Sequence, residues 1–452
     1  MPKVKKKIDN SIWYNNPKCS IISEMLYKNN WRGIYSKEFN ISKPEDNKNK
    51  SCNSIIKIRL HPNKEQKLIL NKFFNQSRFI YNKLIECFYK KYKTAYWLWA
   101  DKSKGFKYGR EQWATKEAIK RKIKYGHVPK YLELDNIPAH IVSNNLNDIC
   151  SSINTIKSLY KNGVIKKWPK IKYKSYKDTT SIILPKLDIR EVTNEYISMF
   201  PRFFKDKKIK IKGLNNLEIK HDCRLQKLPN CKFYLCIPND KDQINNKKDN
   251  LEDYNVCSID PGIRTFLTVY DPKTNKTEKY GNCEDLKRIK IRLKIIDSIN
   301  SKLSKLSKIH GKKERRIRYE LRKKIKCLYQ RIKNIRKDMH HNFSKKLLDK
   351  YDIIYLPNYE IKKFDLTNSN NKNARCWGFF EFKTILKDKA SLYSNKSIID
   401  CSEEYTSKAC SKCFKIHEKL GGLEVFECPH CKHKIDRDEN GAINILIKNL
   451  VC

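Results

Sequence analysis

The sequence of 452 residues lacks any long apolar run, and acidic residues are scarce in it. No stretch approaches the roughly 18 consecutive apolar residues of a membrane span, and the opening MPKVKKKIDN lacks the apolar core of a secretory signal. We therefore expect neither a membrane protein nor a secreted one. Hydrophobic residues make up only 39% of the chain, which allows folded domains but keeps each core small. At roughly 150 residues per domain, the length predicts about three domains.

Basic residues outnumber acidic ones two to one. The chain has 98 Lys and Arg against 49 Asp and Glu, a formal charge of 98 − 49 = +49. A lysine-rich codon usage raises the lysine content but does not explain the shortage of acids. Such a charge calls for a polyanionic partner, and nucleic acid is the best candidate. Aromatic and basic residues interleave over 89–113, which suits base stacking beside phosphate contacts, although the rings fit the core of a helical domain equally well.

The cysteines indicate both a compartment and a metal site. An odd count of 17, without an export signal, indicates a reducing, intracellular compartment. The cluster PKVKKK is a weak nuclear address, so nucleus and cytoplasm both stay open. Four cysteines stand apart as two CxxC pairs, Cys410 with Cys413 and Cys428 with Cys431. This spacing is typical of a zinc ribbon, in which four thiolates close a structural Zn²⁺ site.

The hydrophobic pattern changes along the chain. Residues 1–52 are polar and basic, and we expect them to form a largely flexible extension. Asn63, with Gln66 three positions later, predicts the capped start of a helix. Short β-like pieces between 181 and 250 predict a small barrel or sheet. The region 284–350 predicts an amphipathic helix or helical hairpin with one basic face.

Two acidic positions are candidates for metal-dependent chemistry. Asp260 ends the apolar strand VCSID just before Pro261-Gly262, where a carboxylate can hold a divalent cation, although such residues often only cap a turn. A second cluster lies in DRDENGA, from Asp436 to Glu439, directly after the cysteine pairs. Acids at a helix N-terminus are also explained by capping. The position beside the zinc knuckle favours a functional role.

Taken together, these segments resemble the TnpB/Fanzor family of transposon-encoded RNA-guided DNA endonucleases. The resemblance covers about residues 55–452, and the position of one glutamate resembles the Fanzor branch in particular. The matching segments are IKIRLHPNKEQ…RFIYN, SIDPGIRTFLTVYD, IRKDMHHNFSKKL and YTSKACSKC…CPHCKHKIDRDENGAINIL. Their common order and spacing are more specific than any one of them alone.

The resemblance implies a multi-domain α/β fold. A helical recognition domain is set into a β-barrel (WED/OB-like) domain, and an RNase-H-like (RuvC) nuclease domain contains an inserted zinc ribbon. The expected boundaries are an N-terminal extension over 1–52, the barrel over 53–63 and 181–250, the helical domain over 64–180, the nuclease over 251–408 and 436–452, and the ribbon over 409–435.

The resemblance also implies three carboxylates that bind Mg²⁺ in a two-metal hydrolysis of phosphodiester bonds. Asp260 matches the first, and Asp438 matches the third, with Asp436 as the fallback.

The second carboxylate departs from the usual pattern. Most relatives place a glutamate at the end of the strand DIIYL, where this chain has Pro357. The Fanzor branch places it just ahead of the zinc knuckle, which points to Glu403, with Glu404 and then Glu360 as fallbacks. Strand parity does not separate Glu403 from Glu404, because both faces of the preceding strand look buried.

The resemblance implies a guide RNA and a double-stranded target DNA as partners, and it leaves the oligomeric state open. The main alternative is a nuclease-dead RNA- and DNA-binding protein that regulates transposition or silences targets. A transposase that joins DNA ends directly is weaker, because the sequence shows no separate strand-transfer nucleophile.

Overall fold

The computed structural model describes residues 12–36, 38–41, 52–91, 138–176, 178–205, 207–212, 219–241, 243–307, 309, 311–358, 374–418, 420–421 and 423–451. The chain forms two compact units, one from Met1–Cys52 with Lys241–Cys452 and the other from Asn53–Asp240. PKVKKK, Glu360 and the part of the aromatic-basic stretch 89–113 beyond residue 91 lie outside the described residues. The finer domain boundaries stay predictions. Within the described ranges, no helix combines the length and apolarity needed to cross a membrane.

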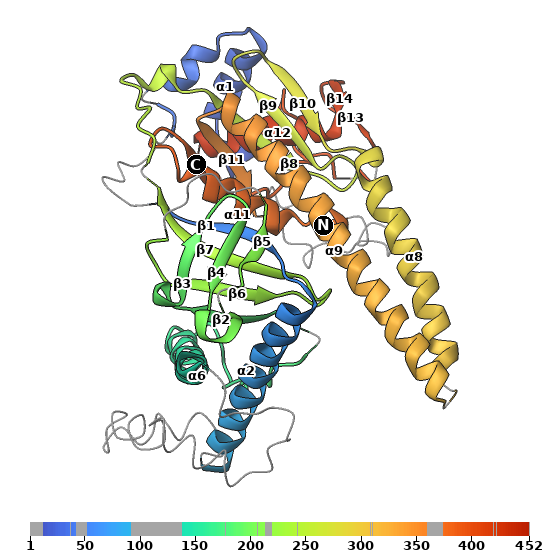
Figure 1. Cartoon of the computed structure of the whole chain (residues 1–452). Helices are drawn as coiled ribbons and strands as arrows, with labels where there is room; N and C mark the ends of the chain where they lie inside the picture. Colours follow the sequence, from blue (N-terminus) through green and yellow to red (C-terminus); the bar gives the residue numbers. More distant parts are fainter. Residues whose placement is uncertain are drawn as a thin grey trace. The chain divides into compact units, whose positions relative to one another are not determined.

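The unit Asn53–Asp240 contains a seven-stranded sheet in the order β2-β6-β7-β1-β5-β4-β3 (Figure 1). Its strands are β1 (Cys52–His61), β2 (Thr180–Leu184), β3 (Ile189–Val192), β4 (Tyr196–Met199), β5 (Ile209–Ile211), β6 (Cys223–Lys227) and β7 (Phe233–Lys241). The pairings β1–β5, β2–β6, β3–β4, β4–β5 and β6–β7 are antiparallel. The sheet predicted between 181 and 250 is therefore present, and the N-terminal β1 completes it.

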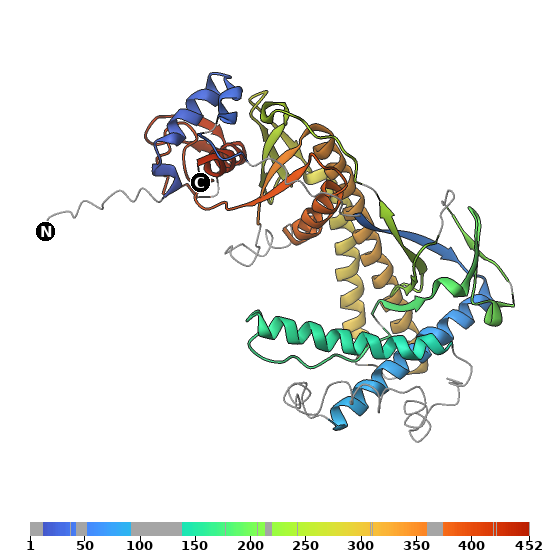
Figure 2. The same cartoon turned by 90° about the vertical axis from the view of Figure 1, so that its left-hand side faces the viewer.

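Helices pack against this sheet. They are α2 (Lys64–Lys91), α6 (Ala139–Lys161) and the short α7 (Pro201–Phe204). Helix α2 begins at the predicted cap: the Asn63 side chain accepts from the Gln66 amide at 2.8 Å, and the Gln66 side chain accepts from the Asn63 amide at 3.0 Å. Helices α2 and α6 cross and contact each other (Figure 2).

The other unit is built on a five-stranded mixed sheet in the order β10-β9-β8-β11-β12. The strands are β8 (Val256–Pro261), β9 (Leu267–Asp271), β10 (Lys276–Tyr280), β11 (Ile353–Pro357) and β12 (Ser397–Cys401). Strands β10, β9 and β8 are antiparallel, whereas β8, β11 and β12 run parallel. The region of the two CxxC pairs adds the hairpin β13 (Val425–Glu427) and β14 (Lys434–Asp436).

Each face of this sheet is covered by different helices. Alternate residues such as Cys257, Ile259 and Leu356 join a core with α8 (Cys283–Ser307), α9 (Lys312–Lys350) and α11 (Phe379–Ala390). The intervening residues, such as Val256 and Tyr355, join a second core with α12 (Arg437–Val451). Helices α8 and α9 form a hairpin, which is one of the two arrangements predicted for 284–350 (Figure 1).

The expectation of a flexible N-terminal extension over 1–52 is wrong for residues 12–36 and 38–41. These residues form η1 (Trp13–Asn15), α1 (Lys18–Tyr27) and η2 (Trp31–Tyr35). Buried apolar side chains at widely spaced positions join the core around α12; they are Trp13, Cys19, Ile22, Leu26 and Ile34. The polar composition hid this role, because the segment buries one stripe against a helix more than 400 positions later in the chain.

Adjacent isoleucines on α1 provide a matched test of this packing. Ile22 is fully buried, whereas Ile21 is 44% exposed. We expect Ile22→Ala to lower the free energy of unfolding of this unit by about 2–5 kcal/mol, because it leaves a cavity. Ile21→Ala should change it by less than about 0.5 kcal/mol. Denaturant unfolding monitored by circular dichroism measures both, and equal effects of the two substitutions would show that α1 is not packed as described.

Candidate active site and metal centre

Three segments far apart in the sequence bring the candidate carboxylates together. Asp260 is near the end of β8, Asp438 is in the first turn of α12, and Glu403 follows the end of β12 by two residues. Helix α12 lies so close to β8 that a Cβ atom at Gly441 would be 2.5 Å from Oδ2 of Asp260. The hydroxyl of Ser258 on β8 donates to the Ala442 carbonyl of α12 at 2.6 Å. This contact holds the first turn of α12 beside the end of β8.

The sheet register places Pro357, the residue that departs from the family pattern, level with Asp260 across the strands. Tyr355 of β11 pairs with Ser258 of β8, so continuing this parallel register by two residues sets Pro357 level with Asp260. On the other side, Pro357 pairs with Cys401 of β12. The position where most relatives are expected to carry a glutamate is thus beside Asp260, and a proline occupies it. Glu403 comes two residues beyond this row on the neighbouring strand.

The structure gives Glu403 and Glu404 different surroundings, which the sequence alone did not. Ile399 and Cys401 belong to the core around α12, whereas Ile398 packs into the core on the opposite face. Since residues alternate between faces, Glu403 continues the row on the α12 side, the side of Asp260. Glu404 is exposed, and its carbonyl accepts a hydrogen bond from the Trp13 indole at 2.9 Å.

The electrostatics show that these acids act on one another. The pKa of Asp260 is raised well above its usual value, first by desolvation and then by the negative charges of Asp438 and Glu403. The pKa of Asp438 is also raised, by burial and by the charge of Asp436. The site therefore accumulates negative charge that a bound cation would neutralise.

The carboxylates are more widely spaced than the ligands of one ion. Metal ligands in proteins are mostly His, Cys, Asp and Glu side chains. In the described part of the chain, the four cysteines are the only group of three or more of these residues whose ligand atoms all lie within 4.8 Å of one another. A two-metal site, whose ions lie about 3.5–4 Å apart, does not require all of its ligand atoms to be that close together. Oxygen ligands of this kind are those that Mg²⁺ prefers.

Asp436, the fallback for Asp438, has a different structural role. Its Oδ1 accepts from the backbone amides of Asp438 at 2.9 Å and Glu439 at 3.2 Å, which caps the N-terminus of α12. Its Oδ2 pairs with Lys279 at 2.8 Å. Both oxygens are thus engaged within the protein, whereas Asp438 lies toward Asp260 and Gly262.

The four cysteines form a cluster able to hold zinc. The sulfur atoms of Cys410 and Cys431 are 3.6 Å apart, and those of Cys413 and Cys428 are 3.5 Å apart. A tetrahedral site with Zn–S distances of about 2.3 Å places its sulfurs about 3.8 Å apart, so the cluster is close to the required size.

The cluster also favours a thiolate at one position. Burial alone would raise the pKa of Cys428, but the backbone amides of Cys431 and His430 donate to its sulfur and lower the pKa to about 7. Burial raises the pKa of Cys413 to about 11. A bound cation would stabilise all four thiolates, because zinc coordinates the deprotonated form.

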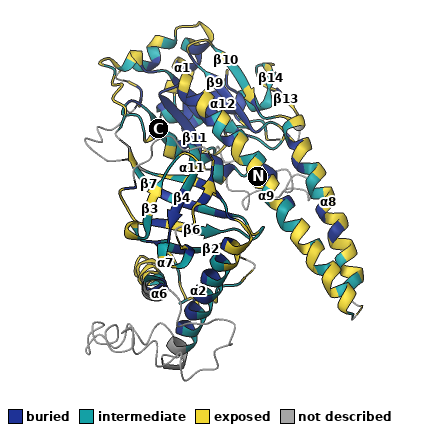
Figure 3. Ribbon diagram, viewed as in Figure 1, coloured by how far each residue is buried: buried dark blue, intermediate teal, exposed yellow. Residues whose placement is uncertain are grey.

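Sequence reasoning missed the side chains that connect the cluster to the acids. The buried Asn440 and Asn444 of α12 donate to the Ala409 carbonyl at 2.8 and 2.7 Å, just before Cys410. The ammonium group of Lys448 donates to the Ser402 hydroxyl at 3.1 Å and to the Glu404 carbonyl at 3.4 Å. Helix α12, buried along most of its length (Figure 3), thus holds Asp438, the zinc knuckle and the segment bearing Glu403. Polar residues within the otherwise apolar stretch NGAINILIKNL, such as Asn444 and Lys448, could have indicated these buried hydrogen bonds.

Comparison with known proteins gives three family matches along the chain. Residues 53–94 match the "Helix-turn-helix domain" of OrfB_IS605, 238–363 match "Probable transposase" (OrfB_IS605), and 379–445 match "Cas12f1-like, TNB domain". In the structure, residues 53–94 contribute strand β1 and the single uninterrupted helix α2 rather than two helices joined by a turn.

Relatives match most of the chain. TnpB-like proteins L770 and R854 of Acanthamoeba polyphaga mimivirus are each 28% identical over 425 residues, covering 88% of this chain and 75% and 74% of their own. The mini-RNA-guided endonuclease CRISPR-Cas_phi3 has a solved structure that covers 89% of this chain and 93% of its own, with 10% identity and a TM-score of 0.44. That structural likeness is low, and the sequence matches carry the assignment. Together, these matches support a TnpB-family protein.

Loss of one ligand thiol should remove the metal. We expect Cys413→Ser to reduce bound zinc from about one ion per chain to none and to lower the melting temperature, because the ribbon hairpin has only a small core of its own. Metal analysis of the purified protein measures this. Cys231→Ser, at an exposed free thiol in the other unit, is the control and should keep the zinc. Full zinc content in Cys413→Ser would contradict the four-thiolate site.

Neutralising Asp260 should stabilise the metal-free protein at neutral pH. A carboxyl with a raised pKa in the folded state contributes stability that is present below the pKa of the unfolded chain and is lost as the pH rises through the folded-state value. At neutral pH the ionised group is therefore destabilising.

We expect Asp260→Asn in the presence of a chelator to melt at a higher temperature than the parent at pH 7, with a smaller difference at pH 4. Thermal melting at the two pH values measures this. A variant that is less stable at pH 7 would contradict the crowding of charges around Asp260.

Proposed function

We propose that the protein is an RNA-guided, divalent-metal-dependent DNA endonuclease. The observation that carries the proposal is that Asp260, Glu403 and Asp438 come together from three separate segments. They lie on the α12 side of the sheet, near the carboxyl ends of β8 and β12, where their charges interact. Family membership supports it, since the chain matches transposase and Cas12f1-like models. The mixed five-stranded sheet supports the expected RNase-H-like (RuvC) nuclease domain.

Asp260, Glu403 and Asp438 would hold two Mg²⁺ ions. The donor set fits, because it consists of carboxylates and because desolvation, together with the charges of Asp438 and Glu403, raises the pKa of Asp260. When bound, such ions polarise a phosphoryl oxygen and lower the pKa of an attacking water. The chain's own part is to keep three carboxylates aimed at one place in a partly buried site.

Glu403 takes the place of the glutamate absent at Pro357. It is the residue whose charge acts on Asp260, whereas the Glu404 side chain is exposed. The alternation of faces along β12 supports the same choice. Asp438 is preferred to Asp436 because the Asp436 carboxylate is already used for capping and for Lys279.

A basic surface supports polyanionic partners. Helix α9 has 16 basic residues against four acidic ones, a balance of 16 − 4 = +12. Its outer side, like that of α8, is largely exposed (Figure 3). Such one-sign charge binds phosphate backbones without regard to sequence. In the proposed mechanism, pairing with a guide RNA reads the target DNA while the protein holds the heteroduplex by its backbone.

The nuclease-dead alternative rests on Pro357. If no acid replaces the missing glutamate, the protein keeps nucleic-acid binding without cleavage. Substituting Glu403 and Glu404 one at a time distinguishes the nuclease from the nuclease-dead protein, because only Glu403 belongs to the proposed site.

We expect Glu403→Gln to reduce target cleavage by at least about 10³-fold, since residues that act as one unit lose activity together. Glu404→Gln should remain within about threefold of the parent, because its side chain is exposed and its contacts with Trp13 and Lys448 use the backbone carbonyl. The measurement is single-turnover cleavage of target DNA with Mg²⁺ and the co-purified guide RNA.

Loss of cleavage in Glu404→Gln alone, or in neither variant, would refute the assignment of Glu403. A parent protein that binds guide and target but never cuts would favour the nuclease-dead function.

A further inference from the structure

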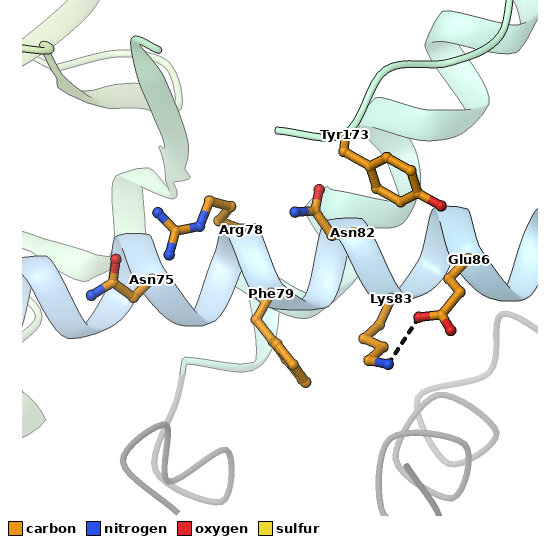
Figure 4. A pocket seen from close by; sticks show the side chains of 7 residues that line it. All are labelled: Asn75, Arg78, Phe79, Asn82, Lys83, Glu86 and Tyr173. Carbon is orange, nitrogen blue, oxygen red and sulfur yellow. Dashed lines mark hydrogen bonds and ion pairs between the residues drawn. The ribbon is translucent and has the colours of Figure 1, made fainter. Parts of the chain in front are cut away.

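A cavity of about 240 Å³ lies along α2 in the unit Asn53–Asp240. Figure 4 shows its side chains on successive turns of one face of α2, with the ring of Tyr173 from the segment after α6 lying alongside them. The lining residues are Asn75, Arg78, Phe79, Asn82, Lys83, Glu86 and Tyr173. The cavity is smaller than the roughly 300–1,000 Å³ of sites for larger ligands, and this favours a single planar group.

The segment that bears Tyr173 is held rigidly. The Asn82 side chain accepts from the Lys174 amide at 2.8 Å and donates to the Lys174 carbonyl at 3.1 Å. The ammonium group of Lys174 pairs with Asp148 of α6 at 2.9 Å and lies 3.9 Å from the centre of the Tyr81 ring. Tyr173 itself remains 56% exposed. The fold thus fixes the backbone beside Tyr173 and leaves the Tyr173 ring open to a ligand that stacks on it.

Two polar groups in the cavity are available to a ligand. Among the described residues, neither the Asn75 amide nor the Arg78 guanidinium has a hydrogen bond or an ion pair, and Arg78 lies 5.9 Å from the centre of the Tyr176 ring. Lys83, by contrast, is paired with Glu86 at 2.8 Å. The cavity therefore combines a stacking surface, a hydrogen-bonding amide and a cation that has no carboxylate partner in the described part of the chain.

We propose that this cavity binds one unpaired nucleobase of a single-stranded nucleic acid. The base stacks on Tyr173, which lies beside Asn82, and the neighbouring sugar-phosphate backbone follows the same face of α2 to Arg78 and Asn75, which contact it (Figure 4). The inference rests on the part of the proposed function that makes nucleic acid a partner of the protein. It does not depend on DNA cleavage.

The test compares a normal strand with one that has no bases. The probes are a fluorescent ten-nucleotide oligouridylate and an abasic strand of the same length, in ribose and deoxyribose forms, measured by anisotropy at high salt to suppress other phosphate contacts. We expect Tyr173→Leu to weaken binding of the normal strand by about 5- to 150-fold, the loss of one stacked base, with no change for the abasic strand. Tyr173→Phe keeps the ring and should bind like the parent.

Tyr196→Leu is the matched control, since this half-buried tyrosine of the same unit lies outside the cavity. A loss with ribose strands only identifies RNA as the source of the base, and an equal loss with both forms identifies either strand; both support the site. Unchanged binding in Tyr173→Leu, or an equal loss with the abasic strand, would overturn it. Because no cleavage is measured, an inactive nuclease would leave these results unchanged.

Discussion

The close approach of α12 to β8 is the constraint on which the site depends. With only 2.5 Å between Oδ2 of Asp260 and the place of a Cβ atom at Gly441, no side chain fits there without displacement. The same approach brings Asp438, one turn earlier on α12, toward Asp260 and removes water from both carboxyls. The protein thus holds like charges together in a partly buried place, which is unfavourable for folding and useful for binding cations.

The same helix connects this site to the zinc cluster and to the N-terminal segment. Asn440 and Asn444 bind the backbone just before Cys410, and the indole of Trp13 binds the backbone at Glu404. The hydroxyl of Tyr27 on α1 lies 3.0 Å from both Ser411 and His433 in the ribbon. The metal cluster and the N-terminal segment therefore support the loop that bears Glu403. This loop needs the support because it lies beyond the end of β12, outside the hydrogen-bonded part of the sheet.

Local patterns predicted much of this unit. The strands of the central sheet, the α8–α9 hairpin and the four-cysteine cluster follow from apolar runs, helical spacing and CxxC pairs. Asp260 and the acidic cluster from Asp436 to Glu439 were candidates because each lies at the end of an element with a recognisable motif, and the family resemblance selected Asp438 within the cluster. In the other unit, the capping box of α2 was readable for the same reason, since both partners lie within four residues.

Long-range packing was not predictable in this way. Residues 12–41 looked flexible because their few apolar residues find partners only when α12 is in place. The family resemblance favoured Glu403, but strand parity did not separate it from Glu404, since the pattern SIIDCSEE does not reveal which face α12 covers. That information is contained in the tertiary structure alone, where Ile399 and Cys401 pack toward α12 and Ile398 packs away from it.

The central claim is that Asp260, Asp438 and Glu403 form one cation site. The most direct measurement is an anomalous-difference map at the manganese absorption edge from crystals of the full chain soaked in Mn²⁺. The account predicts density between the carboxylates of Asp260, Asp438 and Glu403, distinct from the metal at the four cysteines. Manganese bound at Glu404 or Asp436 instead, or no density beside Asp260 in fully soaked crystals, would contradict it.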